Sequence, residues 1–341
     1  METIKTPQPS KEYLESVYRD KNVLITGGLG FIGSNLAISL TGLGAKVVIV
    51  DSLIEDYGGN LFNIEPVKDN VRVNISDVRD EPGMLHLVKG MDFIFNLAGQ
   101  VSHIDSMLNP YVDLEINCKS QLTILEACRK NNKDVKIVFA GTRQQYGKPV
   151  YLPVDEKHPI HPTDVNGINK MAGEWYHILY NNVYGIRAVS LRLTNTYGPR
   201  QLLKHNRQGF FGWFIRQIID GEEIKIFGDG SQIRDFSYVA DTVVAFLIAG
   251  ANDNAFGNIY NLGGSERFNL KSLVELMIKI FGSGNYSIIP FPEERKKIDI
   301  GDFYANYEKI EGELGWSPKT NLEEGIRETF KYYTQFKKYY W

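Results

Sequence analysis

The sequence is poor in cysteine. Its 341 residues include two cysteines, Cys118 and Cys128, and their spacing is not that of a metal site. We therefore expect no bound metal, and we expect both side chains to pack in a core or an interface. Low cysteine usage of this kind indicates a reducing compartment, so the sequence predicts a cytoplasmic protein.

The sequence also lacks a strong excess of one charge. It carries 38 basic and 41 acidic residues, a net charge of −3, so nothing in the balance favours nucleic acid or an anionic membrane as a partner. No apolar run approaches the roughly 18 residues of a membrane-spanning helix. Residues 1–20 are polar and charged, without the apolar centre of a signal peptide. We interpret them as a leader with one helix at 11–18.

What the sequence does contain is a glycine-rich turn between a strand and a helix, at residues 21–34, which read KNVLITGGLGFIGS. The β-branched run 22–26 is typical of a buried parallel strand. Gly27 would form a tight turn, Gly30 would let the main chain approach a pyrophosphate, and Gly33 would let the helix pack closely on the strand. The phosphates would then meet free N–H groups at the helix N-terminus. The expected contacts are Gly27, Gly30, Phe31, Ile32 and Gly33.

The next strand, 46–50, ends on Asp51. An acid at that position suits the hydroxyls of an adenosine ribose and would repel a 2′-phosphate, so the segment predicts NAD rather than NADP as the cofactor. The alternative is a structural glycine turn followed by a helix-capping acid. Further contacts with NAD are expected where the strands at 71–75 and 93–97 end, at Asp77, Val78, Leu97, Ala98 and Gln100.

Strand-like and helix-like segments alternate up to about residue 195, which predicts an α/β protein with a doubly wound parallel sheet of the Rossmann type. Two helices, at 113–131 and 167–183, are long and carry apolar stripes. After residue 198 the segments become shorter. We therefore expect a leader at 1–20, an NAD-binding domain at 21–198 with contributions from about 236–262, and a smaller α/β substrate lobe at 199–341.

Several motifs together resemble the extended short-chain dehydrogenases that remodel nucleotide-activated sugars, a family of epimerases, 4,6-dehydratases and decarboxylases. The resemblance runs from about residue 21 to residue 316. It is carried by TGGLGFIGS, Asp51, Asp77, NLAGQ at 96–100, the block at 140–147, Asn169-Lys170, LTNTYGPR at 193–200 and GDGSQIRDFSYVAD at 228–241. The segments AGQV at 98–101, Asn109-Pro110 and residues 115–117 look most like the CDP-paratose 2-epimerase branch.

The resemblance implies a transient hydride transfer that involves NAD. A sugar hydroxyl loses its proton to a base while its carbon gives up a hydride, and the resulting ketone permits inversion, elimination or decarboxylation. Thr142 matches the residue that hydrogen-bonds the reacting oxygen, and Lys170 matches the lysine that binds the nicotinamide ribose. The structural alternatives are a turn-capping hydroxyl for Thr142 and a solvated helical lysine for Lys170.

The tyrosine that the family carries four residues before this lysine is replaced by Asn166. A carboxamide does not titrate near neutral pH, so it cannot serve as the phenolate does. Either another group is the base or the hydride chemistry has been lost. Lys170 is one candidate, because burial beside a cationic nicotinamide should lower its pKa. Tyr146 and His103 are the other two.

A second departure concerns the reaction. The 4,6-dehydratases carry an Asp-Glu pair directly after the threonine, and the decarboxylases keep the glutamate, whereas this chain has Arg143 and Gln144. Both reactions are therefore disfavoured, and epimerisation is the expected one. The alternatives are a net dehydrogenase or ketoreductase, a 4,6-dehydratase, and a non-catalytic NAD-binding regulatory protein.

The resemblance also implies a nucleotide-diphosphate sugar as substrate and a homodimer. The helices at 113–131 and 167–183 match the pair that packs against its two-fold mate in the family. Arg234 matches an arginine that clamps the diphosphate, a role that suits a planar, bidentate donor. The expected substrate contacts are His103, Arg143, Asn195, Arg234 and Arg295. For Arg295, an ordinary surface charge is an equal alternative.

Overall fold

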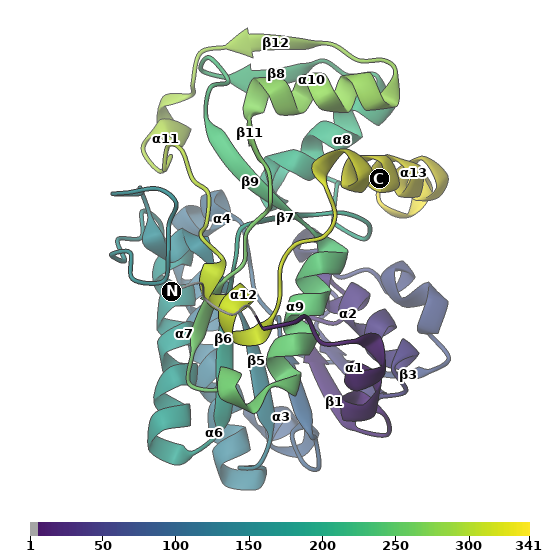
Figure 1. Ribbon diagram of the computed structural model, residues 1–341, viewed down its shortest axis with the longest axis vertical. Coiled ribbons are helices and arrows are strands. Elements are labelled where there is room, and N and C mark those ends of the chain that lie inside the picture. The colour runs from purple at the N-terminus through teal and green to yellow at the C-terminus, as the bar shows by residue number, and fades with distance from the viewer. Residues whose placement is uncertain (1–5) are drawn as a thin grey trace.

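The computed structural model describes residues 6–341, and its main element is a seven-stranded sheet (Figure 1, lower half). The strands are β1 (Asn22–Thr26), β2 (Lys46–Asp51), β3 (Val71–Ile75), β4 (Phe93–Asn96), β5 (Lys136–Thr142), β6 (Arg187–Leu193) and β10 (Ile259–Asn261). Their order is β3-β2-β1-β4-β5-β6-β10, and every neighbouring pair is parallel. The predicted doubly wound parallel sheet is therefore confirmed.

Helices cover both faces of this sheet, because successive residues of a strand point to opposite sides. In β1, Val23 and Ile25 pack with one layer of helices, and Leu24 packs with the other. The first layer is α1 (Lys11–Tyr18), α2 (Phe31–Gly42) and α9 (Val239–Ala251), and the second is α3 (Glu81–Leu87), α6 (Ser120–Asn131) and α7 (Val165–Tyr184). Burial on both faces explains the continuous apolar run at 22–26.

The predicted helix at 11–18 is present as α1, and it is anchored to the sheet domain by its last residue. Tyr18 is fully buried, its ring centroid lies 4.8 Å from that of Phe93, and its hydroxyl donates to the carbonyl oxygen of Leu247 over 2.7 Å. Residues 1–5 of the expected leader lie outside the described residues.

The segment before β5 differs from the single regular helix predicted at 113–131. It consists of α4 (His103–Leu108), α5 (Pro110–Leu114), a π-helical segment η3 (Glu115–Lys119) and α6. A stripe of apolar residues at helical spacing does not reveal a π-helical turn, because the turn adds one residue without removing the stripe. Such turns occur often at functional sites, and Asn117 inside this one contacts the cavity-lining loop described below.

The remaining elements form a smaller lobe above the carboxyl ends of the strands (Figure 1, top). A three-stranded sheet joins β7 (Asn195–Tyr197), β9 (Ile233–Tyr238) and β11 (Arg267–Asn269), and a parallel pair joins β8 (Ile224–Phe227) and β12 (Tyr286–Ile289). The lobe helices are α8 (Phe210–Asp220), α10 (Leu270–Phe281), α11 (Glu293–Lys296) and α13 (Leu322–Phe336), with α12 (Glu308–Leu314) against β10. Ile215, Val274 and Ile326 are fully buried in the core between α8, α10 and α13.

Short 3₁₀ helices complete the chain: η1 (Glu55–Tyr57), η2 (Leu61–Val67), η4 (Arg143–Tyr146), η5 (Asn206–Gln208), η6 (Asp253–Ala255) and η7 (Lys337–Tyr339). Within residues 6–341, no helix is both long and apolar enough to cross a bilayer.

Candidate active site

A cavity of about 730 Å³ lies between the carboxyl ends of the parallel strands and the smaller lobe. Its lining includes the glycine turn after β1 on one side and Arg234 of β9 on the other. The strand order of the sheet reverses between β1 and β4. In open α/β sheets, ligands bind in the crevice outside the strand ends at such a reversal.

The turn after β1 keeps its close main-chain contacts only because Gly27 and Gly33 lack a Cβ. A Cβ on Gly27, whose φ is +70°, would lie 2.9 Å from the main-chain nitrogen of Ala98. A Cβ on Gly33 would lie 2.2 Å from the carbonyl oxygen of Gly27. The residues Gly27, Gly30, Phe31, Ile32 and Gly33 all line the cavity at the N-terminus of α2. This cradle fits the pyrophosphate of a dinucleotide.

Asp51 closes the adenosine end of the cradle. Its two carboxylate oxygens accept hydrogen bonds from the main-chain nitrogens of Leu29, at 3.0 Å, and Leu53, at 2.9 Å. Burial raises the pKa of this carboxyl group, while the two hydrogen bonds lower it. Each carboxylate oxygen can accept more than one hydrogen bond, so Asp51 retains acceptor capacity for ribose hydroxyls.

The other residues expected to contact NAD also line the cavity. Asp77 is held by Arg79, whose side-chain hydrogen bonds lower the pKa of the carboxyl group. The main-chain nitrogens of Leu97 and Ala98 donate to the hydroxyl of Thr26 over 3.0 and 3.1 Å. The full set is Asp77, Val78, Leu97, Ala98 and Gln100.

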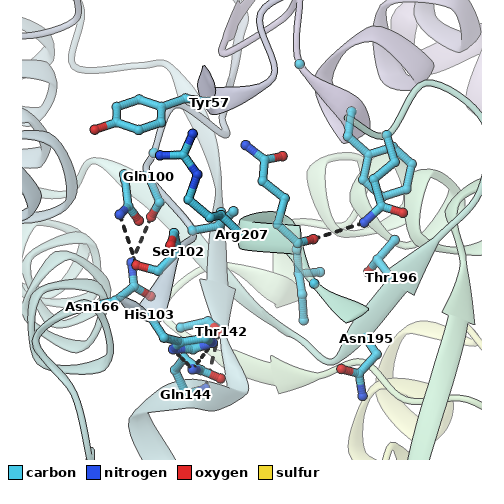
Figure 2. Close-up of a pocket in the computed structure, with 18 of the residues that line it drawn as sticks. Tyr57, Gln100, Ser102, His103, Thr142, Gln144, Asn166, Asn195, Thr196 and Arg207 are labelled. Carbon is cyan, nitrogen blue, oxygen red and sulfur yellow. Dashed lines mark hydrogen bonds between the residues drawn. The ribbon is translucent and has the colours of Figure 1, made fainter. Parts of the chain in front are cut away.

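Asn166 is part of a buried amide network that holds the loop at Gln100 (Figure 2). Its Nδ2 atom donates to the carbonyl oxygen of Gln100 over 2.7 Å and to Asp113 over 3.2 Å. Asn117 donates to the same carbonyl over 2.9 Å and accepts from the Gln100 nitrogen over 3.2 Å. Asn169 donates to Asp113 over 2.8 Å. The carboxamide of Asn166 therefore positions the loop.

Lys170 and Thr142 line the same cavity as the glycine cradle. The amine of Lys170 lies 4.4 Å from the ring centroid of Phe139. Burial lowers the pKa of Lys170 to about 8, against the opposing effect of Asp113 and Glu174. The hydroxyl of Thr142 accepts a hydrogen bond from the main-chain nitrogen of Gln144 over 3.2 Å.

The structure does not bring Tyr146 into the cavity. Its side chain is fully buried, its hydroxyl donates to Asn261 over 2.7 Å, and it accepts a hydrogen bond from Arg192. Arg192 is ion-paired with Glu174 at 2.6 Å. Burial raises the pKa of Tyr146 to about 12. This tyrosine supports a buried ion pair, and its place in the fold gives it no route to a substrate in the cavity.

His103 is fixed by an aspartate that the sequence did not single out. Its Nδ1 atom lies 2.7 Å from a carboxylate oxygen of Asp164, whose side chain is 2% exposed, and the amide of Gln144 contacts the imidazole ring. Asp164 also accepts from the nitrogen of Gly167 and so caps α7. An aspartate directly before a helix is an N-cap signal, but its pairing with His103 is visible only in the fold.

The expected substrate residues all line the cavity, and two of them, Arg143 and Asn195, are hydrogen-bonded to each other. Arg143 donates to Asn195 over 3.2 Å, and Asn195 donates to the carbonyl oxygen of Asp235 over 2.9 Å. Arg234 lies 3.7 Å from Asp299. Arg295 lies apart from this group, with its guanidinium 5.2 Å from the ring centroid of Phe227.

The described residues, 6–341, contain no group of three or more His, Cys, Asp or Glu side chains that could hold a metal ion. Cys118 and Cys128 are both buried and free. Burial raises the pKa of both thiols, that of Cys128 to about 12. The two cysteines are therefore buried thiols, and that of Cys118 is hydrogen-bonded to Tyr176.

Comparison with known proteins also indicates a protein that binds NAD. The model of the NAD dependent epimerase/dehydratase family matches residues 23–263. A putative UDP-glucose 4-epimerase of Methanocaldococcus jannaschii is 37% identical over 306 residues, which are 89% of this chain and 96% of that protein. A CDP-paratose 2-epimerase of Salmonella typhi is 29% identical, over 90% of this chain and 98% of that protein.

Among solved structures, the UDP-glucose 4-epimerase of Thermus thermophilus in complex with NAD superposes with a TM-score of 0.82. It is 30% identical, and the match covers 92% of this chain and 99% of that one. The fold, the glycine cradle and the family model agree. The chain belongs to the NAD dependent epimerase/dehydratase family, and its cofactor is NAD.

Proposed function

We propose that this chain epimerises a nucleotide-diphosphate sugar by transient oxidation of one ring hydroxyl. The observation that carries the proposal is that Thr142, Lys170 and the glycine cradle line one cavity. The similarity to 4-epimerases and a 2-epimerase supports an inversion. NAD, held by the glycine cradle and Asp51, would supply the reversible hydride acceptor that this oxidation needs.

Each residue of the chain has a separate task in this proposal. The cradle from Gly27 to Gly33 and Asp51 hold the dinucleotide. The hydroxyl of Thr142 hydrogen-bonds the reacting sugar oxygen. Lys170 accepts the proton of that hydroxyl and returns it, because a lysine with a pKa of about 8 is partly neutral at physiological pH.

Asn166, which we propose replaces the family's tyrosine, has a positioning role. Both of its described hydrogen bonds are donated by the amide nitrogen, to Gln100 and Asp113. A carboxamide in this position keeps the loop that faces the nicotinamide in place, and it takes no proton. His103, held by Asp164, is placed to contact the sugar and remains the competing base.

The two residues after Thr142 are not the acids that the dehydratases and decarboxylases carry there. Arg143 and Gln144 follow Thr142, and neither can deliver a proton to a leaving hydroxyl as a carboxylic acid does.

Arg234 and Arg295 are the proposed clamps for the two phosphates, since both residues line the cavity and come from the smaller lobe.

We also propose a homodimer. Several large apolar side chains of α4, α5 and α7 are exposed, among them Leu108, Tyr111, Trp175, Leu179 and Val183. Tyr111 is 82% exposed, and side chains of this kind in one region favour a contact with a second copy. Sedimentation at micromolar concentration tests this, and a monomer would contradict it.

The test of the function uses the purified protein without added cofactor. We expect denaturation to release NAD or NADH, and we expect a panel of UDP-, dTDP-, GDP- and CDP-sugars to give an epimer by NMR. Absorbance near 340 nm should stay almost flat during turnover. A steady rise with added NAD would indicate a net dehydrogenase, and no product from any sugar would indicate a non-catalytic protein.

A further inference from the structure

Arg143 has an unsatisfied N–H group in the cavity wall. Its Nη2 atom donates to Asn195 over 3.2 Å, but its Nη1 atom is buried and has no hydrogen-bond partner. No carboxylate among residues 6–341 forms an ion pair with it, in contrast to Arg234, which lies 3.7 Å from Asp299. Buried polar groups are normally satisfied, so an orphaned guanidinium nitrogen beside a cavity points to a missing anionic group.

The charges around Arg143 also indicate a missing anionic group. Burial, together with the nearby Arg234, lowers the pKa of Arg143 to about 10, so the group is charged at neutral pH but poorly compensated. Asp235, Asp164 and Asp299 oppose this shift, but none of them forms an ion pair with Arg143 in the described part of the chain. The Oδ2 atom of Asp235 accepts from the main-chain nitrogens of Gly264 and Ala305, at 3.3 and 3.2 Å, and its Oδ1 atom is buried without a hydrogen-bond partner.

The guanidinium of Arg143 is held in place before any ligand arrives. Asn195 fixes one end of it, and the ring centroid of Phe303 lies 5.0 Å from its Cζ atom. A planar, preorganised guanidinium is well suited to a carboxylate, because little side-chain entropy remains to be lost on binding.

The position of Arg143 in the chain favours the sugar over the diphosphate. It directly follows Thr142, the residue proposed to contact the reacting hydroxyl, at the end of β5. The proposed diphosphate clamps, Arg234 and Arg295, come from the lobe side of the cavity. An anion next to Thr142 would be a substituent of the sugar ring. Because Arg234 is close enough to lower the pKa of Arg143, the experiment below separates this site from a diphosphate contact.

Resting on the proposed function, we propose that Arg143 is the carboxylate subsite of this cavity and that the substrates are acidic nucleotide-diphosphate sugars, of the hexuronate class. The free Nη1 group of Arg143 would donate to the sugar carboxylate, and Asn195 would keep the guanidinium aligned. Arg143 thus selects the substrate, and Thr142 and Lys170 act on it.

The experiment first finds the nucleotide by calorimetric titration of the NAD-loaded protein with UDP, dTDP, GDP and CDP. The matched hexose and hexuronate of that nucleotide, for example UDP-glucose and UDP-glucuronate, are then titrated into the wild type, Arg143→Gln and Arg143→Lys. Arg295→Gln is the control for loss of a diphosphate contact. Retained NAD and an unchanged melting temperature identify the variants that are folded.

We expect the wild type to bind the hexuronate about ten- to a hundredfold more tightly than the hexose. Arg143→Gln should abolish this ratio while leaving the affinity for the free nucleotide unchanged, and Arg143→Lys should restore part of it. Arg295→Gln should weaken all three ligands equally.

Three results would overturn the proposal. A wild type without preference for the hexuronate would make Arg143 a structural neighbour of Asp235, and this comparison needs no variant. Equal weakening of nucleotide, hexose and hexuronate by Arg143→Gln would assign Arg143 to the diphosphate. If neither sugar nor nucleotide binds to protein that retains NAD, the proposed function itself fails, and the carboxylate subsite fails with it.

Discussion

The two halves of the cavity are built in different ways. The cofactor half is made mainly of main chain, glycines and the carboxylates of Asp51 and Asp77, and its parts lie at successive strand ends between residues 27 and 100. The sugar half is made of side chains that come from distant segments, such as His103, Asp164 and Arg234. The first half is set by local turn geometry, whereas the second depends on how the lobe and α7 are placed over the sheet.

Lys170, where the two halves meet, should show the largest effect. Lys170→Met keeps most of the volume and removes the amine, so we expect turnover to fall about 10²–10⁴-fold, the typical contribution of a general base. The wild-type rate should rise as the pH is raised through about 8, because only the neutral amine accepts a proton. Steady-state kinetics from pH 6.5 to about pH 9 check both expectations.

His103→Asn is the matched comparison for this prediction. It should reduce sugar binding while preserving the pH dependence. If His103→Asn removes turnover as fully as Lys170→Met and also removes the pH dependence, the base is His103 and the role given to Lys170 is wrong.

Gly33→Ala tests the cofactor half. The new Cβ would lie 2.2 Å from the carbonyl oxygen of Gly27, so the cradle must shift, and overpacking of this kind typically costs about 1–3 kcal/mol. We expect NAD affinity to fall about ten- to a hundredfold. Gly42→Ala, in the same helix α2, meets no atom within 4 Å and is the control. Equal NAD affinity in Gly33→Ala and Gly42→Ala would contradict the role of the glycine cradle in NAD binding.

This difference between the halves also explains what could be predicted from the sequence. The strand, turn and helix around Gly27 and the acid at Asp51 are local features, and the sheet follows from their repetition. Tyr146 is a candidate base from its place in the block at 140–147. In the fold its hydroxyl accepts a hydrogen bond from Arg192, which is ion-paired with Glu174 in the core. Asp164 was missed because its partner, His103, lies on another segment, and packing alone brings the two together.

Asp51→Asn should have a smaller effect on the cofactor half. The amide keeps an oxygen that can accept from Leu29 or Leu53 but loses the charge that favours ribose hydroxyls and repels a 2′-phosphate. We expect NAD affinity to fall about tenfold, with a relative gain for NADP. Fluorescence titration of both dinucleotides checks this, and an unchanged preference for NAD would argue against the role of the carboxylate.

Asn166→Ala should have the smallest effect, below about tenfold in turnover, since it removes a positioning contact and no proton acceptor. Loss of the bond to the Gln100 carbonyl should appear mainly as a higher KM and a lower melting temperature. Asn166→Tyr would sharpen the comparison by supplying a phenol that can share the role of base. If Asn166→Ala is as damaging as Lys170→Met, the assignment of Lys170 as the lone base must be withdrawn.

The central claim is that the carbon-bound hydrogen leaves the sugar as a hydride and is returned to the same carbon. The most direct test is turnover of the accepted nucleotide sugar in D₂O, without added NAD, followed by NMR of the product. We predict an epimer that contains no deuterium at the inverted carbon. An epimer with deuterium at that carbon would show inversion by deprotonation, and it would contradict the transient oxidation proposed for this cavity.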